Sequence, residues 1–471
     1  MVQASRRDEE FRQYALTAPP MRTLLTVCVP LALYQALQSI FKILDALMAA
    51  HISSSAVSAV SCLSQITLMI TALGSGLAVG GSIKISEAYG RGEYELVHRR
   101  TATLYAMATL ASLLAAAVLI PFAGPFLRLL NTPEELILVG AGYFRVEILC
   151  LVVAFFNTVY IAIERSRGHA RKILVINGAV IVIKLGLSAL FVYRLDGDVA
   201  AIAAATLISQ LVLLAYALFS MARDSGAFRF SAGSVHLKGP TVLPILNLSY
   251  PVAAEKMLFA AGKVVVNSMS GRYGELTVGA LGISNNIGGL TTGWHAGMLD
   301  GASALISQNR GAGRYRRTLQ LYACLLVVDV AIGALGLAVM TWALPWMAQV
   351  FAQSKQQFDP QFCGMIISIH RWEMLGYVTL GVNSATLALL LGYGYTKLTL
   401  ALNVARVFLF RVPVLWALQS FTSLGVEAVG LTMMISNLCA GLSAAAVAVP
   451  VVRRIRRLEA QAPCGAGPGG G

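Results

Sequence analysis

Twelve long apolar segments follow one another along the chain, and they constrain its fold more than any other feature. A helix needs about 20 mainly apolar residues to cross the hydrocarbon layer of a membrane. With 57% hydrophobic and 12% charged residues, the chain of 471 residues lacks the charged surface of a soluble protein. We therefore expect an all-α integral membrane protein with twelve transmembrane helices. The predicted helices cover residues 23–50, 55–80, 101–127, 143–164, 173–193, 199–221, 245–270, 276–306, 318–345, 364–391, 398–420 and 426–450.

Lys and Arg are distributed unevenly between the connections on the two sides of these helices. One side receives 23 of them, and the other receives Arg128, Arg194, Arg272 and Lys355. Because Lys and Arg concentrate in cytoplasmic connections, this bias predicts a protein of the cell membrane with both termini in the cytoplasm. The same placement accounts for the net charge of +14, so we expect no nucleic-acid partner. The seven cysteines form no Cys-x-x-Cys pair, which leaves a metal or redox site without support.

The chain contains an internal duplication. When residues 30–94 are superimposed on 251–315 by a shift of 221, fifteen of 65 positions are identical, and a shift of 226 continues the match. Each half holds an even number of helices, so we expect two pseudo-symmetric six-helix bundles in one orientation, enclosing a central cleft. The predicted parts are a cytoplasmic segment 1–22, bundles 23–221 and 245–450, a cytoplasmic linker 222–244 and a basic, Gly-rich tail 451–471.

Several short motifs at matching places in the two halves resemble the multidrug and toxic-compound extrusion (MATE) transporters. The first helix and its loop carry 30–32 (PLA), 44–48 (LDALM) and 56–60 (AVSAV). The paired loops after the second and eighth helices are 85–92 (ISEAYGRG) and 306–313 (ISQNRGAG). The loop before the eleventh helix is 392–397 (GYGYTK), with a weaker copy at 168–171 (GHAR) before the fifth. The resemblance covers residues 22–450.

This resemblance implies a secondary active exporter of small organic compounds that works by alternating access and is driven by inward H⁺ or Na⁺. It implies no cofactor and no ATP hydrolysis, and the sequence contains no G-x-x-x-x-G-K-[ST] phosphate loop. The expected partners are a small-molecule substrate, the coupling ion and the lipid bilayer. We expect a monomer that is not an enzyme.

Asp45 is the strongest candidate for ion coupling, because it lies deep in the first segment and matches the family's coupling acid there. Tyr34, Gln38, Lys42 and Asp45 recur at spacings of three and four, so they line one helix face that should border a cavity. A buried carboxylate can exchange a proton for a cation as the cleft opens to each side. A structural ion pair with Lys42 is the alternative.

The fifth segment departs from the family, which often has Asn and then Asp four residues later. Lys184 and Ser188 occupy these positions here, while Asn177 remains on nearly the same face. An ammonium near Asp45 would repel Na⁺, so we expect H⁺ rather than Na⁺ to be the coupling ion. A fixed Asp45–Lys184 pair without a transport role is the alternative. Thr206 lies where the family's sixth helix approaches the site.

In the second half, Glu255 follows Pro251 by one turn and matches an acid found in part of the family. It is a candidate site for a proton or a cationic substrate. Lys256 and Lys263 share a face with Asn267, and their charge favours an anionic or zwitterionic substrate. The alternative is that these lysines pair with Glu373, Asp300 or Asp329.

Other polar features of the membrane segments have structural interpretations. Arg145 and Glu147, with their copies Arg371 and Glu373, are predicted to form ion pairs at helix ends. His295 is interpreted as a hydrogen-bonded packing residue. The G-x-x-x-G spacings, Gly76/Gly80 and Gly297/Gly301, predict close helix packing.

Two other functions fit parts of the sequence. A flippase for a lipid-linked saccharide, within the same wider superfamily, would also use lysines in its cavity, but such proteins usually have fourteen helices. A membrane-embedded prenyl-transfer enzyme would need paired aspartates, and the membrane segments contain no Asp-Asp or D-x-x-D motif.

Overall fold

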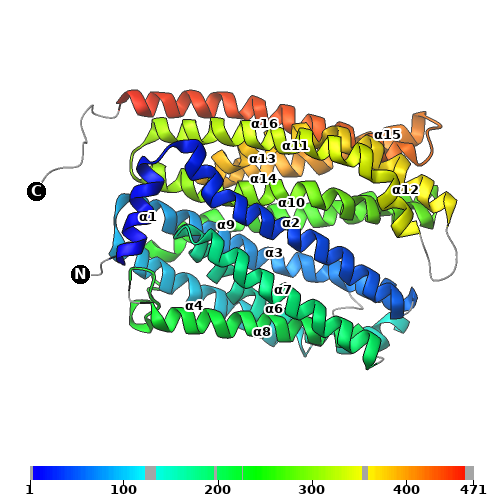
Figure 1. The fold of residues 1–471 in the computed structure, drawn as a ribbon, viewed down its shortest axis with the longest axis horizontal. Coiled ribbons are helices and arrows are strands. Elements are labelled where there is room, and N and C mark those ends of the chain that lie inside the picture. The colour runs from blue at the N-terminus through cyan, green and yellow to red at the C-terminus, as the bar shows by residue number, and fades with distance from the viewer. Residues whose placement is uncertain are drawn as a thin grey trace, which may run out of the picture.

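The computed structural model describes residues 4–52, 54–121, 134–195, 199–224, 226–352 and 359–461, with the side chains of 42–43, 45–69, 134–144, 199–200 and 275 left undescribed. These residues form long helices and contain no β-strand. The helices run along the long axis of the molecule (Figure 1). Among the described residues, nine helices are long and apolar enough to cross a membrane. The predicted all-α membrane fold is confirmed.

Each of the twelve predicted segments corresponds to one helical rod, and most rods extend beyond the predicted limits. The tenth rod is interrupted by the 3₁₀ turn η3 (Met374–Gly376), and the eleventh contains the π-helix η4 (Ala405–Arg411). The first half contains α2 (Pro20–Ile52), α3 (Ser54–Arg91), α4 (Tyr94–Leu119), α6 (Glu134–Ser166), α7 (Ala170–Arg194) and α8 (Val199–Arg223). The second contains α9 (Gly239–Ser270), α10 (Glu275–Gly311), α11 (Tyr315–Ala352), α12 (Pro360–Glu373) with α13 (Tyr377–Gly392), α14 (Thr396–Val404) with α15 (Val412–Phe421), and α16 (Glu427–Gln461).

The backbone repeats between the halves at the turns as well as in the helices. Gly92 and Gly313, related by the shift of 221, have φ of 80° and 71°. Gly168 and Gly394, related by the shift of 226, have φ of 77° and 74°. Positive φ is strained for residues with a Cβ, so each turn depends on glycine. These paired turns confirm the duplication in three dimensions.

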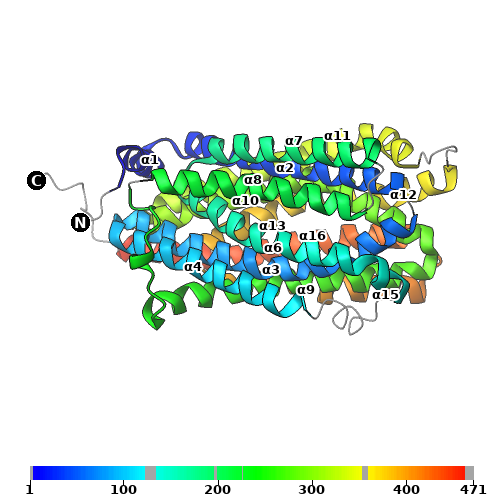
Figure 2. The same cartoon turned by 90° about the horizontal axis from the view of Figure 1, so that it is seen from below.

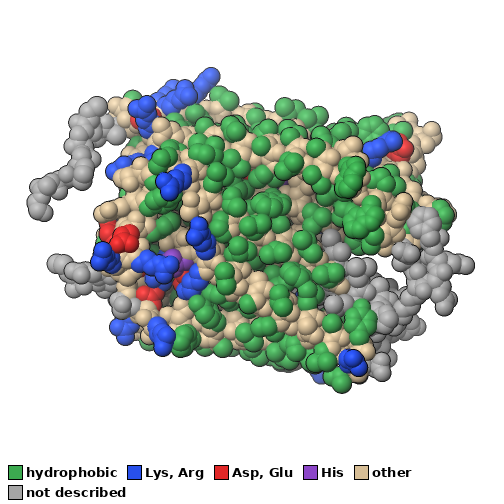
Figure 3. Space-filling view, in the orientation of Figure 1, with side chains coloured by type: hydrophobic (Ala, Val, Ile, Leu, Met, Phe, Trp, Pro, Cys, Tyr) green, Lys and Arg blue, Asp and Glu red, His purple; other side chains and the backbone are tan. Residues whose placement is uncertain are grey.

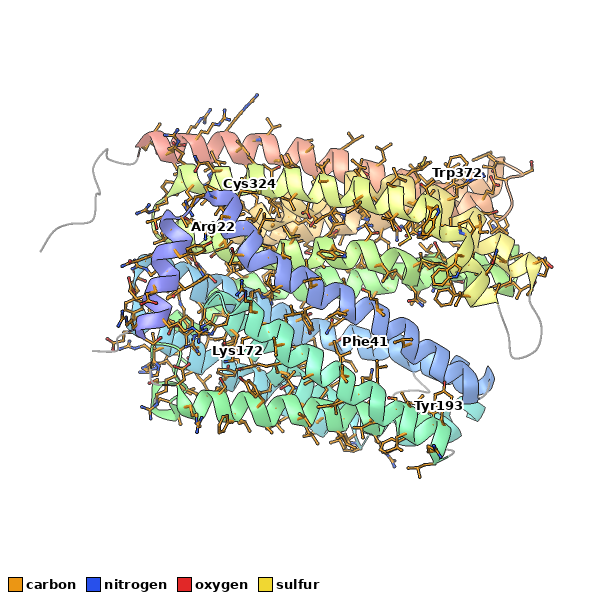
Figure 4. All side chains as sticks on the ribbon, viewed as in Figure 1. Arg22, Phe41, Lys172, Tyr193, Cys324 and Trp372 are labelled. Atoms are coloured by element: carbon orange, nitrogen blue, oxygen red, sulfur yellow. The ribbon has the colours of Figure 1, made fainter. Side chains whose placement is uncertain are left out.

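The described chain begins and ends at the same end of the bundle, as an even number of rods requires (Figure 1). Lys and Arg gather at that end, and apolar side chains cover most of the visible lateral surface (Figure 3). Arg22 and Lys172 lie at this basic end, whereas Tyr193 and Trp372 lie at the opposite end (Figure 4). We call the end that carries the chain termini the basic end.

Close helix packing joins the halves along two pairs of helices. A Cβ added at Gly76 would lie 2.7 Å from the Cβ of Ala253, and one at Gly80 would overlap Ser249, so α3 packs tightly on α9. In the same way Gly297 and Gly301 of α10 pack against α2, where a Cβ at Gly301 would lie 2.7 Å from the Sγ of Cys28. The packing prediction for both G-x-x-x-G spacings is confirmed.

The basic end is closed by reciprocal contacts between the two copies of the loop motif. A Cβ at Gly90 would overlap the carbonyl oxygen of Gln308, and a Cβ at Gly311 would overlap that of Glu87. Ser307 Oγ donates to the carbonyl of Ile83 at 2.9 Å. These approaches bring the backbones of the two halves into direct contact at this end.

The amphipathic helix α1 (Arg6–Thr17) lies across the basic end and contacts both halves (Figures 1 and 2). From the first half's side, Gly90 O accepts from the guanidinium of Arg12 at 3.2 Å. From the second half, Asn309 Nδ2 donates to the carbonyl of Ala15 at 3.2 Å, and Arg317 Nε donates to it at 3.1 Å. The predicted segment 1–22 therefore includes a helix that bridges the closed ends of the halves.

A buried charge cluster fixes α1 to the first half. Asp8, which is fully buried, accepts two hydrogen bonds from Arg167 at 3.1 and 3.2 Å. Arg167 also pairs with Glu164 and with Asp224, which follows α8. Burial alone would lower the pKa of Arg167, but the carboxylates of Glu164, Asp8 and Asp224 together raise it above its ordinary value. Arg167 therefore remains charged and ties α1, α6 and the start of the inter-half connection together.

Candidate functional site

A cavity of about 570 Å³ lies between the two halves. It begins where the close packing of α3 on α9 ends, since Ser75 and Lys256 line it while Gly76 and Ala253 are in contact. The cavity therefore lies beyond these contacts from the closed basic end. The described lining residues are Gln38, Thr71, Ala72, Ser75 and Thr158 from the first half, and Glu255, Lys256, Phe259, Ala260, Lys263, Asn403 and Arg406 from the second.

Glu255 is the one carboxylate among the described lining residues. Its side chain is half-buried, and its Oε1 accepts a hydrogen bond from Asn403 Nδ2 at 2.7 Å. Asn403 is itself buried and belongs to α14, the first part of the fifth rod of the second half. The duplication relates Asn403 to Asn177, so the second half joins an acid of its first rod to the repeated asparagine of its fifth.

Three cations of the second half line the cavity, and two of them lie beside one aromatic ring. Lys263 Nζ lies 5.4 Å from the ring centre of Phe259, and the guanidinium carbon of Arg406 lies 5.6 Å from it. Lys256, one residue after Glu255, is exposed within the cavity. Arg406 is part of the π-helix η4 and donates to Asn437 Oδ1 at 2.7 Å. A π-turn changes the direction of the side chains that follow it and often occurs at functional sites.

The three acids considered as alternative partners of these lysines have other ion-pair partners. Asp300 Oδ1 lies 2.7 Å from the guanidinium of Arg165, across the boundary between the halves. Asp329 Oδ1 lies 3.0 Å from Nδ1 of the buried His295, which confirms the packing interpretation of that histidine. The third acid, Glu373, belongs to a separate buried network.

That network overturns the predicted Arg371–Glu373 pair. Glu373 accepts from the hydroxyl of Ser284 at 2.6 Å and lies 3.7 Å from the ring of His370. Arg371 instead points to Glu427, 3.9 Å away. The prediction was wrong because residues 371 and 373 lie on different faces of α12, and the carboxylate turns inward while the guanidinium turns outward.

The predicted first-half site residues whose side chains the structure describes are not among these lining residues. The side chain of Asp45, like that of Lys42, lies outside the described residues. Lys184 is half-buried on α7. Asn177 donates to the carbonyl of Ile173 in its own helix at 2.8 Å.

Two further predicted residues also lie away from the lining. Ser188 is fully buried, and its hydroxyl has no hydrogen-bond partner within the described part of the chain. Thr206 donates to Ile202 O at 3.1 Å. Of the predicted set, the cavity brings together Glu255 and Lys263.

Sequence reasoning did not assign Asn403, Phe259 or Arg406 to the site. The repeat that aligns Asn177 with Asn403 was the available signal for the asparagine. Arg406 is a charged residue inside an apolar segment, a type that usually faces a cavity or a partner. Phe259 carried no signal, since one aromatic residue in an apolar helix is indistinguishable from a packing residue.

Comparison with known proteins agrees with this architecture. The chain is 22% identical over 417 residues to a probable multidrug resistance protein of Bacillus subtilis (strain 168), YoeA, covering 86% of this chain and 88% of the relative. It is 24% identical to an FAD transporter of Shewanella oneidensis, covering 92% and 95%. The fold matches a MOP-superfamily transporter from Pyrococcus furiosus, whose structure is described as having a binding pocket of reverse polarity, with a TM-score of 0.89, 18% identity and coverage of 96% and 99%.

The family comparison finds the same domain in both halves of the chain. The MatE family model matches residues 30–190 and again residues 251–417, and the second match begins 221 residues after the first. This offset equals the shift that superimposes the two halves. The matched residues make up more than half of the chain, and they include every described residue that lines the cavity. The chain therefore belongs to the MatE family, the multidrug and toxic-compound extrusion transporters.

Proposed function

We propose that this protein exports small organic compounds by alternating access and that inward H⁺ movement drives the export. The observation that carries this proposal is a cavity between two related halves, with reciprocal glycine contacts closing one side of it. Separation of those contacts and closure of the opposite end would expose the same cavity to the other face of the membrane. The curated relatives, named for multidrug resistance and for FAD transport, support an organic cargo.

The basic end faces the cytoplasm in this proposal, because Lys and Arg mark cytoplasmic connections. The conformation described here is then the one closed to the cytoplasm, with the cavity on the outward side. The protein acts as a monomer in the cell membrane. The family assignment favours export over the flippase activity considered from the sequence.

Asp45 in the first half and Glu255 in the second are the proposed proton carriers. A carboxylate is costly in an apolar, dry environment unless it is neutralised, so each conformational change favours its protonated or paired form differently. Asn403 stabilises the charged form of Glu255 while the cavity is open. Lys184 disfavours Na⁺ in the first half by like-charge repulsion.

Transport by purified protein in proteoliposomes tests this function directly. A panel of cationic and anionic dyes is supplied under an imposed pH gradient or Na⁺ gradient. We expect the pH gradient alone to drive transport, and Asp45→Asn and Glu255→Gln to lower the coupled rate at least tenfold. Glu95→Gln, which changes an exposed acid at the basic end, is the matched control.

The outcomes separate the parts of the proposal. Full coupled transport by Glu255→Gln removes that residue from the mechanism, and the same result for Asp45→Asn removes Asp45. Strict dependence on Na⁺ refutes the interpretation of Lys184. Transport of no dye under either gradient contradicts the export function itself.

A further inference from the structure

We propose that the cavity between the halves selects organic anions that carry a planar aromatic group and a carboxylate or phosphate. The inference rests on the proposed transport function and names the class of cargo that the second half would hold. Its basis is the placement of Lys263 and Arg406 beside Phe259, with Lys256 in the same cavity lining.

The described lining of the cavity carries more positive than negative charge. The described lining residues contribute three cations and one carboxylate, Glu255. That carboxylate accepts a hydrogen bond from the amide of Asn403, which uses one of its oxygens. A cleft whose lining carries mainly one sign of charge raises the local concentration of the opposite ions, so the cations among the described lining residues favour anions. Among these described residues, a cationic drug would meet three like charges and one opposite charge.

Two of the cations lie beside an aromatic ring of the cavity. Lys263 and Arg406 both lie within 6 Å of the Phe259 ring, so positive charge and an aromatic surface occur at the same place. An aromatic ligand can pack against Phe259 and Ala260 while its acidic group reaches the ammonium or guanidinium groups. Arg406 is held by Asn437 at 2.7 Å, which fixes its guanidinium before a ligand arrives. Pre-arranged donors reduce the entropy that binding costs.

The volume of the cavity and the residues of its first-half wall also suit a small organic ligand. A volume of about 570 Å³ is within the range of cavities that hold small organic ligands. The described lining residues of the first half are neutral, and Gln38, Ser75 and Thr158 among them are polar. These groups can orient the polar edge of a ligand without adding charge. Among the described residues, the charges of the lining therefore come from α9 and η4.

The test compares two dyes that share the same tricyclic xanthene ring and differ in charge: fluorescein, which carries a carboxylate and is anionic, and cationic rhodamine 6G. Binding to the purified full-length protein in detergent is measured by fluorescence polarisation at several salt concentrations. We expect the anionic dye to bind more tightly and its affinity to fall with salt. Lys256→Gln and Lys263→Gln should each weaken its binding about fivefold to tenfold.

Three further variants sharpen the comparison. Lys256→Glu should shift the preference toward the cationic dye, and Glu255→Gln should tighten binding of the anionic dye. Lys397→Gln, an exposed lysine at the start of α14 that is not part of the lining, is the matched control and should change neither affinity. Because the two lysines of α9 are exposed in the cavity, these substitutions should leave the thermal unfolding temperature close to that of the unmodified protein.

The result distinguishes the cargo class from the transport function. Tighter binding of the cationic dye, no change in the lysine variants, or no binding of either dye by folded protein overturns the proposal. Selective binding of the anion without transport in proteoliposomes supports the anion site and contradicts the export function. Transport of cationic dyes by a protein that does not bind the anionic dye supports the export function and contradicts the anion site.

Discussion

The closed basic end should open when a methyl group is added at either of two glycines. Gly90 and Gly311 each face a backbone carbonyl of the opposite half, so a Cβ at either position overlaps an atom that no side-chain rotation can move. We predict that Gly90→Ala and Gly311→Ala separate the halves at this end. The opposite conformation, in which these loops are apart, would be unaffected by the added methyl group.

The expected magnitude follows from the cost of overpacking a tight contact. Extra methyl groups in well-packed positions cost about 1–3 kcal/mol, and backbone neighbours place these substitutions toward the upper end. If the cost applies to the closed conformation alone, the ratio of protein open at the basic end to protein closed there rises by about fivefold to 150-fold.

Cys28 provides a native reporter of this opening. It is fully buried between α2 and α10, beside Gly301. In a variant that keeps Cys28 as its one cysteine, the labelling rate by a hydrophilic maleimide in detergent should rise with the open population. Gly282→Ala is the control, because a Cβ there meets no atom within 4 Å among the described residues. Unchanged labelling of Cys28 in both test variants, with normal folding, would refute the reasoning that these contacts close the end.

Substitutions at three other sites have expected outcomes in thermal unfolding of the detergent-solubilised protein. Arg167→Ala should destabilise it by about 3–5 kcal/mol, because Asp8 is left buried without the guanidinium that pairs with it. Adding Asp8→Ala to Arg167→Ala should then lower stability much less than Asp8→Ala does by itself. Since the pKa of Arg167 is raised, its contribution is fully present below its ordinary pKa and should stay constant from pH 6 to 9. His295→Phe should lower stability by about 3 kcal/mol, and Asp329→Asn should recover part of it; no recovery would argue against their pairing. Gly168→Ala should cost about 1–2 kcal/mol, since φ is 77°, and a neutral effect would contradict the strained turn.

The sequence by itself determined the number of rods, their common orientation in the two halves and the end where positive charge gathers. Hydropathy fixes these features because each backbone polar group in lipid must be satisfied inside its own helix. The duplication carried this reasoning further, since it predicted paired turns and paired glycine contacts. The spacing of Gly76 and Gly80, with their copies Gly297 and Gly301, was readable because only small residues allow such close approach.

Tertiary structure alone decided which side chains from distant segments meet. Glu255 reaches Asn403 across 148 positions, and α1 contacts both halves at their closed ends. Periodicity indicates which face of a helix is polar, but the direction of a charged side chain near a helix end depends on its neighbours. The Arg371–Glu373 pair was wrong because residues two apart lie on different helix faces, and the structure shows which partners each side chain takes instead. The π-helix η4, which carries Arg406, left no mark in the hydropathy, because it keeps the helix continuous while it turns one side chain toward the cavity.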